Sequence, residues 1–294
     1  MGARSPRDSR CKPRTVPGRF CREHAEHGGR GIVEAGGVIE KLAVVTGASA
    51  GIGAEFARQL KGRGYSLLLI ARREERLRAL ADEIGGAEIL ATDLSNEDAC
   101  VRCAEEIARR GPSLLVNNAG FGTRGLFHDA DFAKQIEMHQ LHVMAVTRLT
   151  RAVLPGMVAA NAGAIVNVAS VAGFSRSAGN VSYCATKAWM VAFTEGLNLE
   201  MRAAAPRVVV QALCPGFTYS EFHDVMAMDR AAIAKSLWLP AERVVRESLD
   251  ALADGRMTVV PDWRYRWFVR VFPRLPESLR MWLQSRSPHK RGQR

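Results

Sequence analysis

The sequence predicts a doubly wound α/β sandwich of three layers, built on a mostly parallel sheet of seven strands. From Lys41 onward, seven short apolar runs alternate with amphipathic helical patterns, which is typical of consecutive βαβ units. A glycine-rich loop joins the first apolar run to the first helical pattern. The chain has 294 residues, of which 47% are hydrophobic and 24% charged, enough for one α/β domain with a real core.

The predicted strands are spaced so that a helix fits between each pair. In chain order they cover residues 42–45, 66–70, 88–91, 114–117, 164–168, 208–213 and 258–260. Helical patterns such as 53–63 and 74–84 lie between them, and right-handed crossovers then place helices on both faces of the sheet. Residues 217–240 interrupt this rhythm after the sixth strand, so we expect a lid there.

The two ends of the chain differ from this α/β domain of residues 39–260. Residues 1–38 are rich in Gly, Arg and Pro without helical or strand periodicity, and we expect a disordered extension. A bolder hypothesis is that they are not part of the natural protein, because a valine codon at Val38 can serve as a bacterial start. Residues 261–294 form a basic C-terminal extension in which aromatic residues alternate with arginine.

Most of the net charge of +11 lies at the ends. Residues 261–294 hold nine Lys and Arg against two Asp and Glu, whereas residues 41–260 are nearly neutral. A nucleic-acid-binding domain would carry its basic stripe on the fold itself, so we expect no nucleic-acid partner.

Localisation is predicted to be cytoplasmic. No run of about 18 uninterrupted apolar residues occurs, and no apolar segment of a secretory signal follows the basic N-terminus. Cys100 and Cys103 form a CxxC within a helical pattern, but no second pair accompanies them, so we expect plain thiols rather than a metal or redox site.

The glycine-rich loop suits a bound pyrophosphate. Gly47, Gly51 and Gly53 stand in a GxxxGxG pattern between a strand and a helix. Glycine permits a tight turn, close approach of the backbone to a pyrophosphate, and close packing of helix on strand. The helix N-terminus adds unpaired N–H groups. The alternative, a purely structural turn, is disfavoured by the strand–loop–helix context.

This loop resembles the TGxxxGIG signature of short-chain dehydrogenases/reductases. Three later motifs resemble that family in order: NNAG at 117–120, YxxxK at 183–187 and PG at 215–216. The resemblance covers about residues 41–260 and implies a Rossmann-type, cofactor-dependent oxidoreductase. It implies cofactor contacts from Gly47, Ser49, Ala50, Gly51, Ile52, Gly53, Arg72, Arg73, Asp93, Leu94, Asn118, Ala119, Gly120, Tyr183, Lys187, Pro215, Gly216, Thr218 and Ser220.

The end of the second strand favours NADP(H) over NAD(H). NAD-preferring members of the family usually carry an Asp at this strand tip, where this chain has Ala71. Arg72 and Arg73 follow, and guanidinium groups bind a 2′-phosphate through charge-assisted bonds. The alternative is that both arginines only begin the solvated helix. Ala50 argues slightly against NADP(H), since NADP-preferring relatives often carry a basic residue at this position.

Two other cofactor contacts have open alternatives. Asp93 matches the family's adenine-contacting acid, but it could instead be a carboxylate at a helix N-terminus. Thr218 and Ser220 both offer a hydroxyl to the nicotinamide carboxamide, and the sequence does not decide between them.

A catalytic set of Ser170, Tyr183 and Lys187 follows from the resemblance. Tyr183 and Lys187 lie four residues apart, on one face of a helix. A free phenol, with a pKa of about 10, is a reluctant acid or base near neutral pH. We expect the Lys187 ammonium to lower the pKa of Tyr183, and Ser170 to donate a hydrogen bond to the substrate oxygen.

His142 departs from the family pattern and leaves two interpretations. Active members usually carry an Asn at this position, where it anchors a water that links the lysine to solvent. Imidazole can also donate and accept, so His142 could preserve the proton path or carry the proton itself. Alternatively, it is a tolerated substitution with reduced activity or none.

The substrate side is predicted to be apolar. Phe121, Phe174, Phe217 and Phe222 fall where the family lines its substrate cleft, which suits a hydrophobic ketone or alcohol. The alternative for each phenylalanine is ordinary packing in the core or lid.

The C-terminal extension, residues 261–294, has two interpretations. It could pack on the substrate domain or on a second subunit, or it could make peripheral contact with an anionic membrane. The family is often dimeric or tetrameric, so we expect a homo-oligomer.

Together these motifs predict an NADP(H)-dependent oxidoreductase that interconverts a carbonyl and a secondary alcohol. A second hypothesis is a cofactor-binding sensor or scaffold with little turnover, and the unusual His142 keeps it open.

Overall fold

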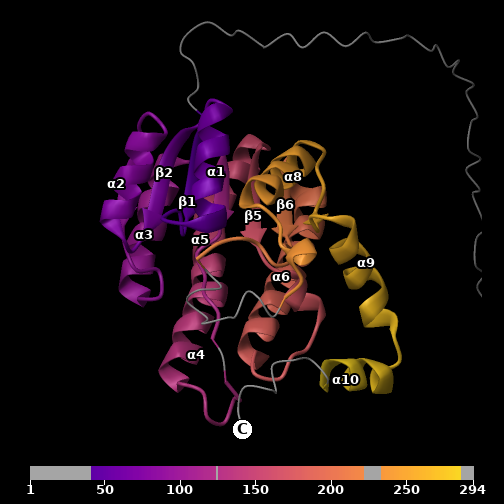
Figure 1. Cartoon of the computed structure of the whole chain (residues 1–294). Helices are drawn as coiled ribbons and strands as arrows, with labels where there is room; N and C mark the ends of the chain where they lie inside the picture. The colour runs from indigo at the N-terminus through magenta and orange to yellow at the C-terminus, as the bar shows by residue number, and fades with distance from the viewer. Residues whose placement is uncertain (1–40, 124, 222–232, 286–294) are drawn as a thin grey trace, which may run out of the picture. The chain divides into compact units, whose positions relative to one another are not determined.

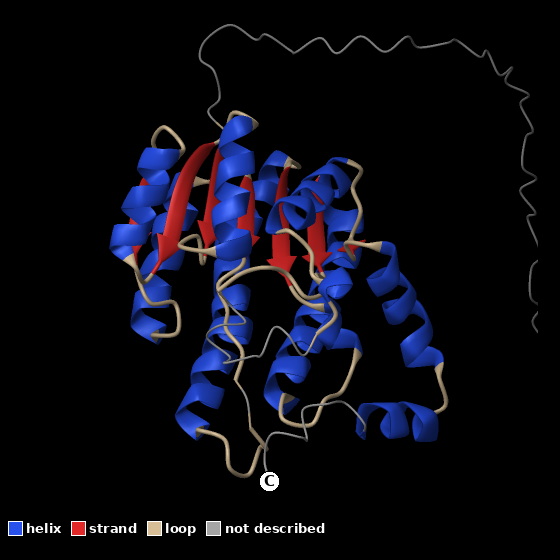
Figure 2. Ribbon diagram, viewed as in Figure 1, coloured by secondary structure: helices blue, strands red, loops and turns tan. Residues whose placement is uncertain are grey.

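The sheet has seven strands, all parallel, in the order β3-β2-β1-β4-β5-β6-β7 (Figures 1 and 2). The computed structural model describes residues 41–123, 125–221 and 233–285. The prediction of a doubly wound α/β fold on seven strands is confirmed, and every strand lies within two residues of its predicted bounds. The strands are β1 (Leu42–Thr46), β2 (Ser66–Ala71), β3 (Glu88–Ala91), β4 (Leu114–Asn117), β5 (Gly163–Val168), β6 (Val208–Leu213) and β7 (Thr258–Val259).

Helices connect the strands and pack on both faces of the sheet (Figure 2). On one face α1 packs against α8, and on the other α3 packs against α5. The helices are α1 (Gly51–Gly62), α2 (Glu74–Glu83), α3 (Glu97–Arg110), α4 (Phe132–His139), α5 (Val146–Ala160), α6 (Val181–Ala204), α8 (Ala241–Ala253), α9 (Trp263–Val271) and α10 (Glu277–Ser285).

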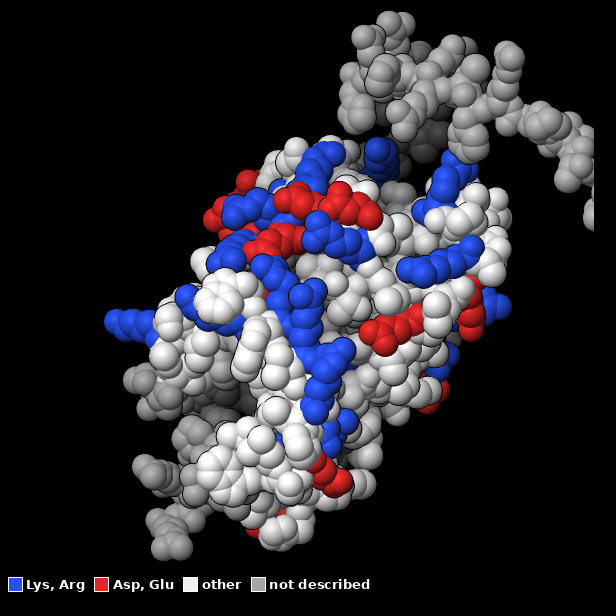
Figure 3. Space-filling model, turned by 90° about the vertical axis from the view of Figure 1, so that its right-hand side faces the viewer, with Lys and Arg blue, Asp and Glu red and all other residues white. Residues whose placement is uncertain are grey.

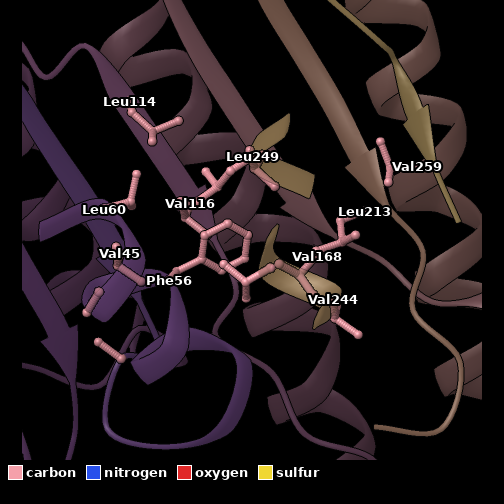
Figure 4. Close-up of a cluster of buried hydrophobic side chains, with 14 of the residues drawn as sticks. Val45, Phe56, Leu60, Leu114, Val116, Val168, Leu213, Val244, Leu249 and Val259 are labelled. Carbon is pink, nitrogen blue, oxygen red and sulfur yellow. The ribbon is translucent and has the colours of Figure 1, made fainter. Parts of the chain in front are cut away.

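Two hydrophobic clusters follow from the alternation of side chains along each strand. Val45 of β1 contributes to the cluster beneath α1 and α8, where Phe56 and Leu60 are buried (Figure 4). Its neighbour Val44 contributes to the opposite cluster, together with Ile107 of α3. Successive side chains of a strand point to opposite faces, so a sheet covered by helices on both sides has continuously apolar strands.

One helical stretch, Phe132–Ala160, contains a single π-helical turn. The turn spans Gln140–Ala145 and joins α4 to α5 without a break. By length and mean hydropathy the stretch is long and apolar enough to cross a membrane. It also carries charged residues such as Lys134 and Arg148, and its apolar side packs into the core through residues such as Leu149.

The strand order places a crevice at one edge of the sheet. The strand arrows visible in Figure 2 point toward the side where α4 and α10 lie, and because all strands are parallel their carboxyl ends share that edge. The chain moves outward in one direction from β1 to β3 and in the other from β4 to β7, so the order reverses between β1 and β4. Ligands of open α/β sheets bind at such a point, beyond the carboxyl ends of the strands.

Several predicted features lie outside the described residues. They are the extension of residues 1–38, the middle of the lid at 222–232, and the predicted substrate residue Phe222. Residues 39–294 group into one unit, so the basic aromatic segment begins within the same unit as the sheet.

Candidate active site

A cavity of about 820 Å³ opens beyond the carboxyl ends of the strands. Both the glycine loop and the predicted catalytic residues border it. The predicted residues along its wall are Gly47, Ser49, Ala50, Gly51, Ile52, Arg72, Arg73, Asp93, Leu94, Asn118, Ala119, Gly120, Phe121, Ser170, Tyr183, Lys187, Pro215, Gly216, Phe217, Thr218 and Ser220. The structure places the predicted residues Gly53, His142 and Phe174 elsewhere.

The three glycines of the loop stand where a side chain would not fit. Gly47 and Gly51 have φ angles of +64° and +55°, which disfavour other residues. A Cβ on Gly53 would lie 2.3 Å from the Gly47 carbonyl oxygen, so Gly53 serves the packing of the loop rather than the cavity wall. A Cβ on Gly51 would lie 2.8 Å from Cβ of Ser220, which brings the loop after β6 against the start of α1.

The glycine loop is tied to the end of β4 by side chains. The Thr46 hydroxyl accepts hydrogen bonds from the backbone N–H groups of Asn118 and Ala119, at 2.9 and 3.0 Å. The Asn118 amide returns a bond of 3.0 Å to the Thr46 carbonyl oxygen and one of 3.2 Å to that of Gly47. Asn118 therefore holds the loop in shape, a role that the motif alone did not reveal.

The start of α1 fits a bound phosphate. Its N-cap, Ala50, provides no side-chain hydrogen bond to the first-turn N–H groups. Such groups, together with the helix dipole, attract an anion. Because Ser49, Ala50 and Gly51 all border the cavity, a dinucleotide pyrophosphate can reach this helix end.

The two arginines after β2 lie in the cavity wall, and both are engaged by carboxylates of the protein. Arg72 contacts Glu137 at 3.1 Å and Asp93 at 3.8 Å. Arg73 donates two hydrogen bonds to the Ser49 hydroxyl, at 3.2 and 3.0 Å, and forms an ion pair of 2.9 Å with Glu221. Their positions suit a 2′-phosphate, but such a phosphate would compete with these carboxylates.

Asp93 is fixed by a local turn. Its carboxylate accepts hydrogen bonds from the backbone and hydroxyl of Ser95, at 3.0 and 2.7 Å. Although burial opposes the shift, these bonds lower the pKa of Asp93. The N-cap of α3 is Asn96, which accepts from the Ala99 N–H, so Asp93 is not the capping residue of that helix.

The predicted catalytic residues meet at the ends of β5 and β6 and the first turns of α6. The Lys187 ammonium donates a hydrogen bond of 2.8 Å to the Val168 carbonyl oxygen and lies 5.8 Å from the centre of the Tyr183 ring. Ser170 begins the 3₁₀ turn Val171–Phe174 and accepts from the Ala172 N–H at 3.1 Å. Its side chain is hydrogen-bonded to Tyr183.

The protein shifts the pKa values of Tyr183 and Lys187 in the directions that favour the neutral phenol and the neutral amine. Burial raises the pKa of Tyr183 to about 12, against a smaller lowering by the Ser170 hydrogen bond. Burial lowers the pKa of Lys187 to about 7. The expected lowering of the Tyr183 pKa is therefore wrong for the protein alone, because desolvation of the phenolate outweighs the stabilising contacts.

His142 is fully buried in the π-helical turn. Its Nε2 accepts a hydrogen bond of 3.2 Å from the Phe121 N–H, and its Nδ1 lies 3.0 Å from the Thr186 hydroxyl, which donates to the Tyr183 carbonyl oxygen. Burial, aided by the nearby Lys187 charge, lowers its pKa well below 6.5. A neutral imidazole with both nitrogens engaged braces the site, which argues against the interpretation that His142 carries the proton itself.

The substrate side of the cavity is largely aromatic. Phe121 and Phe217 line it as predicted, and the C-terminal segment completes the wall with Tyr265 and Phe268 of α9, its C-cap Phe272, and Leu283 and Gln284 of α10. Phe174 instead borders a separate hollow of about 220 Å³, beside Phe272 and Pro273. Sequence reasoning allowed this segment to pack on the substrate domain but did not assign Tyr265, Phe268 and Phe272 to the cavity, although their spacing marks one helical face.

Tyr265 anchors this wall. The buried Tyr265 hydroxyl donates a hydrogen bond of 2.7 Å to the Leu237 carbonyl oxygen and accepts one of 3.1 Å from the Phe217 N–H. A Cβ on Gly216 would lie 2.0 Å from its ring, so the glycine of the PG motif makes room for Tyr265. The extension of residues 261–294 thus packs on the substrate side through α9.

Comparison with known proteins identifies the relatives of this fold. A family model described as short chain dehydrogenase matches residues 41–230. Nodulation protein G of Rhizobium sp. (strain N33) is 37% identical over 190 residues, which are 63% of this chain and 76% of that protein.

Similar solved structures contain different nucleotides. A short-chain dehydrogenase from Sphingobium yanoikuyae in complex with NADPH is 31% identical with a TM-score of 0.72, over 84% of this chain and 96% of that one. One from Burkholderia phymatum in complex with NAD is 28% identical with a TM-score of 0.70, over 79% and 92%. The bulky-bulky ketone specific alcohol dehydrogenase from Comamonas testosteroni is 27% identical with a TM-score of 0.68, over 84% and 94%.

Proposed function

Since this chain belongs to the short-chain dehydrogenase/reductase family, we propose that it interconverts a carbonyl and a secondary alcohol on a hydrophobic molecule, with NADP(H) as the hydride carrier. One observation carries the proposal: Tyr183, Ser170 and Lys187 border the same cavity as the glycine loop and the arginines after β2. An NAD(P)-dependent oxidoreductase acting on CH–OH or C=O groups follows from the family. The choice of NADP(H) and of a hydrophobic substrate is our inference.

NADP(H) is favoured by the residues near the end of β2. Ala71 offers no carboxylate to a ribose, and Arg72 and Arg73 both border the cavity. The Ser49 hydroxyl lies beside the Arg73 guanidinium, so a phosphate there would meet a charged donor and a neutral one. Because similar structures hold either nucleotide, these residues rather than the overall likeness support the assignment.

The chemistry assigned to the chain is proton transfer at one oxygen. When bound, the reduced nicotinamide supplies the hydride. As the carbonyl oxygen gains negative charge, the Tyr183 phenol donates its proton to that oxygen and Ser170 donates a hydrogen bond. Lys187 is held against the Val168 carbonyl oxygen, and when its amine, whose pKa burial lowers to about 7, is protonated, it offers a positive charge near the phenolate that remains. In alcohol oxidation the same phenolate accepts the proton.

A hydrophobic substrate is favoured by the opposite half of the cavity. Phe121, Phe217, Phe268 and Phe272 present apolar surface there. Such a wall stabilises an alkyl or aromatic ketone by removing its surface from water. The Comamonas enzyme, named as specific for bulky-bulky ketones, has a similar fold.

The test measures binding and turnover separately. We expect the protein to bind NADPH more tightly than NADH in a fluorescence titration, and to oxidise NADPH with at least one of a panel of hydrophobic ketones. Tyr183→Phe should lower turnover by at least about 100-fold, because it removes the acid, and should leave the Kd for NADPH unchanged.

Tyr219→Phe is the matched control, since Tyr219 is exposed and stacks on Trp238 away from the cavity wall. Undiminished turnover in Tyr183→Phe would refute the assigned acid. NADPH binding without turnover of any ketone would favour the alternative, a nucleotide-dependent sensor.

A further inference from the structure

Helix α9 has two unlike faces. Tyr265 and Phe268 of α9 and its C-cap Phe272 lie on one side and line the cavity, with Phe268 three and Phe272 seven residues after Tyr265. Trp263 and Trp267 lie four residues apart on the other side, with 65% and 63% of their surface exposed. Contact with the cavity therefore accounts for the aromatic residues on one face of α9, but not for the exposed tryptophans on the other face.

Helix α10 continues this exposed apolar surface. Met281 is 59% exposed, and Leu279, Trp282 and Leu283 are also exposed. We call the exposed side chains of residues 263–284, which include α9 and α10, the C-terminal platform. The side view of Figure 3 faces the end of the molecule where these two helices lie, and there blue Lys and Arg side chains run as a band through a largely white surface.

The charge of the platform has one sign. Residues 263–285 contain five arginines and a single acid, Glu277. Arg266 lies 3.6 Å from Glu247. Among the described residues, no carboxylate pairs with the side chains of Arg264, Arg270, Arg274 or Arg280. The surface thus combines exposed tryptophans with guanidinium groups that lack a partner acid.

We propose that the C-terminal platform docks on an anionic lipid surface. Tryptophan is enriched at membrane interfaces, where its ring is in the apolar boundary and its N–H remains hydrated. Arginines beside it are attracted to negatively charged head groups, and a helix with such a face lies in the interface plane.

A second copy of the chain is a poorer occupant of this surface. In a two-fold dimer the same patch meets itself. Two platforms would then bring their arginines together with only one glutamate on each side, which is electrostatically unfavourable. A bilayer rich in anionic lipid instead offers opposite charge along the whole platform.

Docking has a consequence for the substrate, and this part rests on the proposed function. The helices that present the platform also form the cavity wall, through Phe268, Phe272, Leu283 and Gln284. A docked molecule would hold that wall at the lipid surface. The geometry therefore favours ketones or alcohols that partition into the bilayer over freely soluble ones.

The experiment is co-sedimentation of the full chain with vesicles. One set contains phosphatidylcholine alone, and the other contains about one-third phosphatidylglycerol. We expect pelleting with the anionic set at about 0.1 M NaCl and its loss at about 0.5 M, where charges are screened. The double variants Trp263→Ala/Trp267→Ala and Arg270→Gln/Arg274→Gln should each lower the bound fraction by at least about fivefold.

Matched controls exchange equally exposed residues elsewhere. Phe132→Ala/Leu199→Ala removes two exposed apolar side chains, and Arg102→Gln/Arg151→Gln removes two exposed charges. Both should pellet like the unaltered protein, and all variants should keep the same thermal midpoint and NADPH affinity. Equal pelleting of the tryptophan variant, or equal binding to both vesicle sets, would overturn the proposal. So would a lipid-free dimer that the tryptophan variant abolishes. None of these readouts depends on turnover.

Discussion

His142 is held on both sides of its ring, and this makes Gly120 intolerant of a side chain. A Cβ on Gly120 would lie 2.5 Å from Nε2 of His142. The ring cannot swing away, because it is fully buried and hydrogen-bonded at both nitrogens. The glycine of the NNAG motif and the unusual histidine are therefore matched to each other.

A double-mutant cycle tests this match. We expect Gly120→Ala to lower the free energy of unfolding by about 1–3 kcal/mol, because the new methyl group overpacks the site. In a His142→Asn background the shorter side chain leaves room, so the same substitution should cost clearly less. Urea denaturation of the four proteins gives the coupling. Equal costs in both backgrounds would show that the two residues act independently.

At the scale of single residues, the sequence predicts which residues form the site better than it predicts the surroundings of each one. Ser170, Tyr183 and Lys187 stand at recognisable spacings, and the structure brings all three to one cavity wall. The pKa of Tyr183 was expected to fall, but burial raises it, and burial depends on residues from several distant elements. For the same reason the bonds of His142 to Phe121 and Thr186 have no signal in any single motif.

At the scale of elements, the segment 216–221 after β6 crosses to the nucleotide side of the cavity. Ser220 lies against Gly51, and Glu221 at the far end forms ion pairs with Arg73 and Arg76 of the β2–α2 region. Hydrogen bonds from both arginines lower the pKa of Glu221. The Glu221 carboxylate is therefore paired with the Arg73 guanidinium, which is the group that we assign to the 2′-phosphate.

Replacing Glu221 should therefore tighten NADPH binding. Glu221→Gln removes the competing charge, and we expect the Kd for NADPH to fall about threefold while that for NADH stays nearly constant. Glu106→Gln is the matched control, since Glu106 also bridges two arginines but does so on α3, away from the cavity. A fluorescence titration with both nucleotides gives the four constants. Weaker NADPH binding in Glu221→Gln would show instead that the carboxylate helps to order the site.

The strands were predicted closely because most are buried apolar runs bounded by polar residues, although the edge strand β3 is only partly buried. The C-terminal wall was not assigned to the cavity, although its aromatic face is visible in the spacing of Tyr265, Phe268 and Phe272. Periodicity shows that a helix has an apolar side, but the surface it covers is set by the tertiary fold. Here a single buried hydroxyl, that of Tyr265, joins α9 to the loop after β6.

At the scale of the whole molecule, a buried lysine makes stability depend on pH. The pKa of Lys187 is about 7 in the folded protein, against an ordinary value of 10.5. Between these values the unfolded chain holds a proton that the folded chain lacks, so the free energy of unfolding rises with pH through this window. Below about pH 7 both states are protonated, and the full cost of burying the ammonium remains.

Lys187→Met should remove this dependence. Without added nucleotide, we expect the variant to gain about 3–5 kcal/mol of stability at about pH 6.5 and much less at about pH 9.5. Urea unfolding at the two pH values gives both differences, with the exposed Lys235→Met as control. A gain of the same size at both values would mean that Lys187 does not titrate in this range.

The π-helical turn at Gln140–Ala145 carries a consequence for the register of the whole stretch. Such a turn accommodates about one residue more than a regular α turn does. The wide turn absorbs this extra residue, so deleting one amino acid there would restore regular α winding while the helices on either side keep their phase. Without the wide turn, the extra residue would instead rotate α4 by about 100° and turn Met138, now fully buried, out of the interior. In evolutionary terms, one residue could be gained or lost at this turn without displacing the packed helices on either side.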